Sequence, residues 1–196
     1  MKVISSVYLI VLSISGIAQS PDRWSKGCVT LSDDQVVVGE FSHQEQLDLL
    51  VYRSPEGIKV LPLHQVKLLR YYDSAANINR QFLTIRDTHS FQQWKLYEVV
   101  VQGKMKVVRR LKVHQPQVVA VEADDYNYFV WNNSELISIN EFRNNTYPRL
   151  LEDHAYEIKS FVETHHLGLR DVKSVILILK EYNKLQSQKR LIAQAD

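Results

Sequence analysis

Two histidines near the C-terminus can be tested for metal chemistry from their spacing alone. His154 and His165 are eleven residues apart, and both fall on the apolar side of an expected helix. At the helical rise they are separated by roughly 16 Å along the axis, whereas a helical zinc pair needs a spacing of four residues. We therefore expect these histidines to pack beside a groove, and we predict neither a metal nor a cofactor.

A second group of candidates lies on an expected strand over residues 104–113. Alternate residues of a strand share a face, which gives one basic row consisting of Lys104, Lys106, Arg110 and Lys112. We predict that this row is exposed and is a candidate partner surface. Arg109 falls on the opposite, apolar face, where an arginine needs a carboxylate partner or a route to solvent. We place it in the same groove as the two histidines.

Readable catalytic motifs are absent from the sequence. It contains no G-x-S-x-G, H-E-x-x-H, C-x-x-C or phosphate-binding loop. Residues 122–125 are rich in carboxylates but lack the glycine-bearing spacing of a calcium loop, so we interpret them as a solvated turn. The single cysteine, Cys28, lies in an apolar stretch and reads as a buried thiol. These observations favour a protein that is not an enzyme.

The elements that must position these residues are mainly strands. Short apolar runs recur between Trp24 and about Asn140 without intervening helices, which is typical of an antiparallel meander. Gln102-Gly103 between two long runs is the strongest hairpin signal. We predict strands near residues 26–31, 35–41, 47–53, 58–61, 66–72, 81–86, 95–101, 104–113, 118–121, 126–131 and 135–139.

The apolar period changes to that of helices after Tyr147. One amphipathic pattern, which includes Leu150, Ala155 and Ile158, ends near Gly168, and a second begins near Asp171. Residues 187–196 are polar and are expected to fray. The predicted fold class is α+β, mainly antiparallel β in a rolled sheet, open barrel or sandwich. Residues 19–145 form the β-rich domain, and a C-terminal helical hairpin at 146–196 packs on the sheet.

The first eighteen residues have the pattern of a secretory signal peptide. Lys2 precedes an apolar run, and small residues precede Ala18, where we predict cleavage. The run is shorter than the roughly 20 apolar residues of a spanning helix, so we expect a protein that is not an integral membrane protein. We predict export to the periplasm, the cell surface or the medium.

The charge balance excludes one class of partner. The chain has 24 basic and 22 acidic residues, and removal of residues 1–18 takes away one basic residue, Lys2. A nearly neutral exported protein has no electrostatic reason to bind a polyanion, so we expect no nucleic-acid partner. The oligomeric state is left open.

The layout resembles a family of exported β-rich proteins from Bacteroidota-type bacteria to which no activity is assigned. The resemblance rests on Ala18-Gln19, Trp24, Gly27, Val29-Thr30-Leu31-Ser32-Asp33, Val66, Tyr72-Asp73, the hairpin at 98–104 and Tyr182-Asn183-Lys184-Leu185. It implies export and a β-rich architecture, and it transfers no catalytic residue.

The sequence thus predicts an exported soluble envelope protein, a non-enzymatic binding or structural module for a protein, glycan or lipid partner. Two alternatives remain: a hydrolase of envelope polymers without a readable motif, and a lipocalin-like carrier of an apolar ligand. A cleft that holds a histidine or carboxylate beside polar side chains would count against the binding module and favour the enzyme. A dry apolar cavity would favour the carrier, and an exposed sheet face with scattered histidines would favour the binding module.

Overall fold

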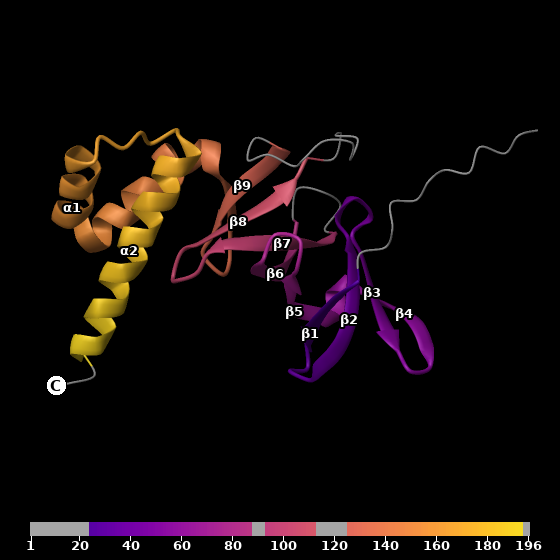
Figure 1. Cartoon of the computed structure of the whole chain (residues 1–196). Coiled ribbons are helices and arrows are strands. Elements are labelled where there is room, and N and C mark those ends of the chain that lie inside the picture. The colour runs from indigo at the N-terminus through magenta and orange to yellow at the C-terminus, as the bar shows by residue number, and fades with distance from the viewer. Residues whose placement is uncertain (1–23, 88–92, 113–124, 194–196) are drawn as a thin grey trace, which may run out of the picture.

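The computed structural model describes residues 24–87, 93–112 and 125–193, which form a ten-stranded antiparallel sheet and two C-terminal helices (Figure 1). The strands are β1 (Ser25–Leu31), β2 (Val36–Gln44), β3 (Leu49–Ser54), β4 (Gly57–Leu61), β5 (Val66–Asp73), β6 (Ile78–Arg86), β7 (Trp94–Val101), β8 (Lys106–Leu111), β9 (Tyr126–Trp131) and β10 (Leu136–Ser138). The helices are α1 (Tyr147–Thr164) and α2 (Val172–Ala193), and short helical turns are η1 (Glu45–Leu47), η2 (Leu63–Gln65), η4 (Ile139–Glu141) and η5 (Phe142–Thr146).

The α+β prediction is confirmed, and so is the hairpin at Gln102-Gly103, which joins β7 to β8. The strand predicted at 118–121 lies outside the described residues. Fraying from residue 187 is wrong as far as Ala193, because α2 continues to that residue.

The sheet is not closed, because its strand order β10-β9-β8-β7-β6-β5-β1-β2-β3-β4 has two ends. The chain first runs through the hairpins β1 to β4. It then returns through η2 and adds β5 to the free edge of β1, after which β6 to β10 follow in sequence order. β1 is therefore a central strand between two meanders, and residues of the N-terminal meander can meet residues of β6 to β9 on one face.

The register of the strands defines this face, which we call the inner face. Directly paired residues lie on the same side of a sheet, and one such row runs Val37, Val29, Leu69, Phe82, Glu98, Arg109, Tyr128 across seven strands. The row begins apolar, becomes charged at β7 and β8, and is apolar again at β9. The two charged residues thus separate two apolar clusters.

The first cluster lies on β1, β2, β3, β5, β6 and β7. It contains Val29, Phe41, Leu50, Leu69 and Phe82, which are all at most 3% exposed. The opposite face of β6 to β8 has a smaller cluster around Ile85, Tyr97 and Val108.

The second inner cluster lies between the sheet and the helices. Val107 and Val130 of the sheet meet Leu150 and Ile158 of α1, and α2 contributes Val175, Ile178, Leu179 and Tyr182. Figure 1 shows both helices beside β7 to β9, away from β1 to β4. Burial of these side chains is the main force that holds the helical hairpin on the sheet.

Helix α1 is kinked, which changes the phase of its apolar stripe. His154 has non-helical dihedral angles (φ −147°, ψ 57°) inside the helix. Leu150 before the kink and Ile158 after it are buried, but Ala155, predicted on the same stripe, is exposed. The prediction for Ala155 is wrong because it assumed one continuous rotation of 100° per residue.

Two polar side chains fix the helical hairpin to the turn between β7 and β8. The Asn183 side chain accepts from Met105 N–H (3.0 Å) and donates to the carbonyl oxygens of Met105 (2.7 Å) and Gln102 (3.2 Å). Asp153 Oδ2 accepts from Lys104 Nζ (2.9 Å), Tyr182 OH (2.6 Å) and Gln186 Nε2 (2.7 Å). The donated hydrogen bonds of Tyr182 and Lys104 lower the pKa of Asp153 to about 2.

Candidate functional site

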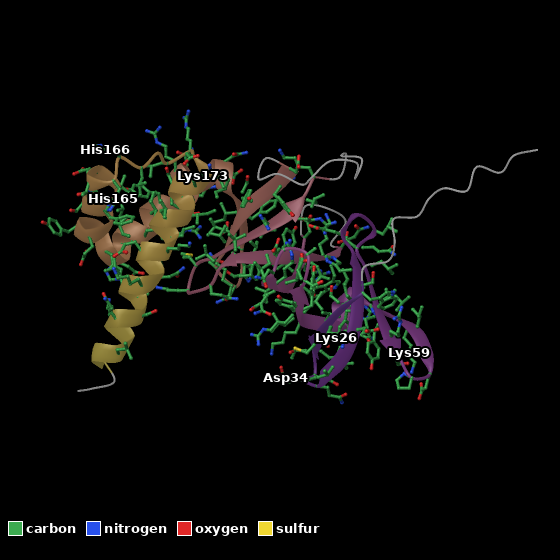
Figure 2. All side chains as sticks on the ribbon, viewed as in Figure 1. Lys26, Asp34, Lys59, His165, His166 and Lys173 are labelled. Atoms are coloured by element: carbon green, nitrogen blue, oxygen red, sulfur yellow. The ribbon has the colours of Figure 1, made fainter. Side chains whose placement is uncertain are left out.

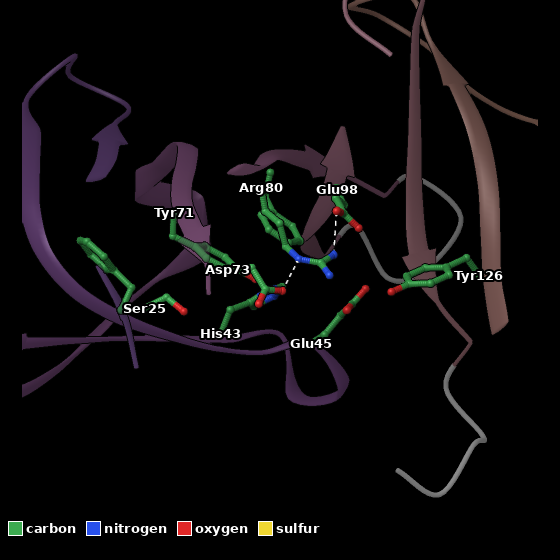
Figure 3. A pocket seen from close by; sticks show the side chains of 10 residues that line it. Ser25, His43, Glu45, Tyr71, Asp73, Arg80, Glu98 and Tyr126 are labelled. Atoms are coloured by element: carbon green, nitrogen blue, oxygen red, sulfur yellow. Dashed lines mark hydrogen bonds and ion pairs between the residues drawn. The ribbon is translucent and has the colours of Figure 1, made fainter. Parts of the chain in front are cut away.

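A cavity of about 200 Å³ opens on the inner face between the first apolar cluster and the charged residues of β7 and β8. Its lining comes from both meanders and from η1, and consists of Ser25, Phe41, His43, Glu45, Tyr71, Asp73, Arg80, Phe82, Glu98 and Tyr126 (Figure 3). Aromatic rings and ionisable groups thus share one small volume, which is the usual composition of a ligand site.

Arg80 lies in the wall of the cavity, and two carboxylates bind its guanidinium group. Its Nε donates to Asp73 Oδ2 (2.7 Å) and its Nη1 to Glu98 Oε1 (2.8 Å), as Figure 3 shows. The Arg109 Nε donates to the other oxygen of Glu98 (2.7 Å). Glu98 is 7% exposed, so both of its oxygens are occupied inside the protein.

These ion pairs keep their members charged. Burial alone would lower the pKa of Arg80 and Arg109, but their hydrogen bonds to carboxylates raise both pKa values. Burial would raise the pKa of Asp73, yet the bond from Arg80 and those from the backbone N–H groups of Ala75 and Ala76 lower it. We call these four side chains, Asp73, Arg80, Glu98 and Arg109, the charged seam. Their charges cancel, and their hydrogen bonds fix them in the wall of the cavity.

Glu45 differs from the other two carboxyl groups. Its Oε1 accepts the Leu111 N–H (2.8 Å), and among the described residues no donor contacts Oε2 and no cation pairs with it. Burial raises the pKa of Glu45, and the Leu111 hydrogen bond and the Arg110 charge only partly oppose this. Figure 3 shows the Glu45 carboxyl group on the Tyr126 side of Arg80, within the cavity.

An ion pair and hydrogen bonds between η1 and β8 hold Glu45 in this position. The Arg110 guanidinium binds both oxygens of Asp48, with an Nη2–Oδ2 distance of 2.9 Å, and also donates to the Glu45 carbonyl oxygen (3.1 Å). Asp48 ends η1 in the left-handed region (φ 50°). This turn, between β2 and β3, therefore contacts the end of β8 at Arg110 and Leu111.

His43 contributes a polar atom without a partner. Its Nε2 is buried and makes no hydrogen bond to the described residues, while its ring meets the Phe82 ring edge to face at 5.1 Å. Burial, together with the Arg110 charge, lowers the pKa of His43 to about 4, so the imidazole is neutral at pH 7. A buried polar atom of this kind is costly unless a ligand or water satisfies it.

Aromatic side chains form the rest of the wall. Tyr71 stacks on Phe82 with the ring centroids 5.5 Å apart, and Phe41 stacks on Tyr52 at 5.2 Å. The Arg109 guanidinium lies 4.0 Å from the centroid of Tyr126. Burial raises the pKa of Tyr71 and Tyr126, so both phenols remain hydrogen-bond donors throughout the neutral range.

The basic row predicted on β8 is not a single exposed face. Arg110 is 8% exposed and is bound to Asp48, which contradicts that prediction. Lys104 lies in the turn before β8 and pairs with Asp153, and half-buried Lys106 donates to Asn133 Oδ1 (2.7 Å). Lys112 is exposed. The alternation of the sequence could not show that η1 would cover the far end of the strand.

The three predicted groove residues lie in different places. Arg109 pairs with Glu98, the His154 ring contacts Tyr182 (6.0 Å between centroids), and the His165 ring packs on Phe161 at a tilt of 39°, with the centroids 4.3 Å apart. His165 is exposed at the outer end of the helical hairpin (Figure 2), so its expected packing on the apolar side is wrong. None of the three lines the cavity.

Most of the cavity residues were missed from the sequence. One signal was available: Glu98 interrupts the apolar run of β7 just as Arg109 interrupts that of β8. Two such residues on facing strands predict each other as partners. His43, Glu45, Asp73 and Arg80 give no comparable signal, because only the pairing of β5 with β1 brings their strands together.

No three His, Cys, Asp or Glu side chains of the described residues are placed to hold a metal ion. The described part of the chain also has no helix that is long and apolar enough to cross a membrane. Comparison of the chain with protein-family models, with curated proteins and with solved structures finds no match.

Proposed function

We propose that this protein is an exported, non-enzymatic binding module that takes one ring-sized polar group of an envelope glycan into the cavity on its inner face. The observation that carries the proposal is the combination of stacked aromatic rings with charges that are already fixed by one another. Sugar rings offer hydroxyl groups that both donate and accept and faces that pack on aromatic rings. The cavity is smaller than the roughly 300–1,000 Å³ of pockets for larger ligands, which suits a single ring.

The state of the carboxylates supports binding over hydrolysis. A glycosidase uses two carboxyl groups, one of which gives a proton while the other attacks or activates water. Both oxygens of Glu98 are held by guanidinium groups, and Asp73 accepts from Arg80 and two backbone N–H groups. Only Glu45 has an oxygen free of described donors, so the second catalytic group is missing.

A hydrolase is nevertheless the second candidate, because the cavity holds a histidine and carboxyl groups beside polar side chains. The raised pKa of Glu45 and the lowered pKa of Asp73 are the contrast found in acid–base pairs. The carrier of an apolar ligand has less support. Such a carrier needs a dry apolar cavity, whereas this cavity is lined by the charged side chains Arg80, Asp73 and Glu98.

Glycan binding is tested by filling the cavity. Ser25 is part of the lining, and Ser25→Trp places a large ring in the cavity without removing any member of the charged seam. We expect the wild type to bind soluble glycan fragments of the envelope in titration calorimetry and Ser25→Trp to lose this binding. The control Ser187→Trp, on the exposed side of α2, should bind as the wild type does.

The same samples distinguish a binding module from a hydrolase. Release of reducing ends from the fragments, abolished by Glu45→Gln, would replace the binding module with a hydrolase. Export is tested separately: the protein recovered from the envelope or the medium should begin at Gln19, as read by mass spectrometry of its N-terminal peptide. An intact Met1 on protein in the cytoplasm would contradict export.

A further inference from the structure

The charges around the cavity leave one carboxyl group unmatched. The carboxyl and guanidinium side chains that line it or bind to its wall are Glu45, Asp73, Glu98, Arg80 and Arg109. Arg80 and Arg109 neutralise Asp73 and Glu98, while Arg110, the next cation, is bound to Asp48. Glu45 therefore has no counter-ion of its own among the described residues, although it is half-buried.

Two acceptor atoms without a described donor belong to residues that line the cavity. Glu45 Oε2 accepts no hydrogen bond from the described residues, and the neutral His43 has a buried Nε2 with no partner. Both residues line the cavity and come from the end of β2 and the turn that follows it. A group that brings hydrogen-bond donors and a positive charge would satisfy both atoms at once.

We propose that the group held in this cavity is a primary ammonium, carried by an amino sugar, with Glu45 as its counter-ion and His43 Nε2 as a second acceptor. This inference rests on the function proposed above. An anionic sugar is disfavoured because both guanidinium groups at the cavity already hold carboxylates. A metal ion is disfavoured because no three ligating side chains of the described residues are grouped.

Glu45 is also placed so that binding changes its protonation. The charged and titratable groups around it are Arg110, Arg109, Glu98, Asp48, Tyr71, Tyr126 and His43. Burial is the main cause of its raised pKa, and an ammonium beside it would lower that pKa again. Binding of an ammonium at pH 5 should therefore release protons, whereas binding of a neutral sugar should not.

The test compares four monosaccharides that differ at one substituent. Glucosamine, N-acetylglucosamine, glucose and glucuronic acid are titrated into the isotopically labelled mature protein and followed by NMR, and protons are counted by calorimetry in buffers of different ionisation enthalpy. We expect glucosamine to bind about tenfold more tightly than the two neutral sugars, to release protons at pH 5, and to shift the signals of His43. Glucuronic acid should bind most weakly.

Two variants assign the preference to Glu45. Glu45→Gln should reduce the advantage of glucosamine over glucose to about twofold and abolish proton release. Glu40→Gln is the matched control, because Glu40 lies on β2, the strand that leads into η1, is paired with Arg53 and does not line the cavity. It should behave as the wild type.

The outcomes separate this inference from the function on which it rests. If glucose or N-acetylglucosamine bound as tightly as glucosamine or more tightly, and Ser25→Trp blocked this binding, the ammonium proposal would be overturned. The proposal of glycan binding would then stand. Binding of lysine amide but of no amino sugar would support the ammonium and overturn the glycan. No binding of any of these compounds would overturn both.

Discussion

Glu98 is the residue through which the neighbouring strands β6 and β8 share charge. It is 7% exposed and accepts from Arg80 on β6 and from Arg109 on β8. Removing a carboxylate of this kind leaves two guanidinium groups partly buried without an acceptor. We expect Glu98→Ala to lower the free energy of unfolding by about 3 kcal/mol, as measured by urea denaturation.

The pair of Arg149 and Glu135 provides the control for Glu98. These side chains are 43% and 51% exposed and form an ion pair of 2.8 Å. Water already solvates both groups, so Glu135→Ala should cost less than about 1 kcal/mol. Equal losses for the two variants would show that the charged seam does not hold the inner face together.

His43 should make stability depend on pH in the weakly acidic range. Its pKa is lowered from 6.5 to about 4 in the folded protein, so between these values the unfolded chain binds more protons than the native one. The contribution of His43 to the free energy of unfolding is complete above pH 6.5 and is lost as the pH falls toward 4. Below pH 4 this contribution no longer changes, and its total loss is up to about 3 kcal/mol.

The measurement for His43 is a comparison of slopes. Urea denaturation between pH 7 and pH 4 should give a smaller loss for His43→Gln than for the wild type, because glutamine does not titrate. His64→Gln changes an exposed histidine of η2 and should keep the wild-type slope. If His43→Gln kept it too, the burial described for the imidazole would be refuted.

At the scale of elements, the turn between β7 and β8 is the place where sheet and helices are joined. Gly103 has a φ of 144°, and a Cβ there would overlap the Asn183 side chain. Asn183 cannot move aside without losing its hydrogen bonds to Met105 and Gln102. Gly103→Ala should therefore cost about 3 kcal/mol or more, from backbone strain and overlap together.

Gly57 isolates the contribution of the overlap. It also has a positive φ, 126°, but a Cβ added there would contact nothing within 4 Å. Gly57→Ala should cost only the backbone strain, about 1–2 kcal/mol. Thermal denaturation of the two variants compares them directly, and equal shifts would mean that Asn183 does not clamp the turn.

The elements were largely predictable from sequence, and the reason is local. Gln102-Gly103 and the predicted α2 stripe depend on turn chemistry and periodicity; the stripe consists of Val172, Val175, Ile176, Leu179 and Tyr182. The kink at His154 was not predictable, since the surrounding residues continue the helical pattern. At the neighbouring position, Asp153 makes tertiary hydrogen bonds with Tyr182, Lys104 and Gln186, which local periodicity does not predict either.

At the scale of the whole molecule, the site is a product of topology. His43 and Glu45 reach Arg80 and Glu98 because β5 pairs with β1, which brings together residues more than thirty positions apart. Hydrophobic patterning predicts that strands exist, but it does not say which strands are neighbours. The inward position of Arg109 could be inferred from the alternation of residues along the strand, whereas the ion pair of Arg110 with Asp48 could not.

The sheet depends on α2 for one side of its second inner cluster. Val107, Tyr128 and Val130 form one wall of the second inner cluster, and α2 supplies Val175, Ile178, Leu179 and Tyr182 as the other. A chain that ends at Arg170 would leave this wall open to water and would lose the Asn183 clamp. We expect it to bind hydrophobic dyes and to associate, without a cooperative unfolding transition.

A shorter deletion separates loss of the core from loss of chain length. A chain that ends at Gln188 keeps Tyr182, Asn183 and Gln186, and removes exposed positions such as Lys189 and Leu191. Its free energy of unfolding should stay within about 1 kcal/mol of the full chain, as measured by urea denaturation. If the chain ending at Arg170 also remained a monomer with the full cooperative transition, the sheet would be stable alone, and α2 would be an appendage rather than part of its core.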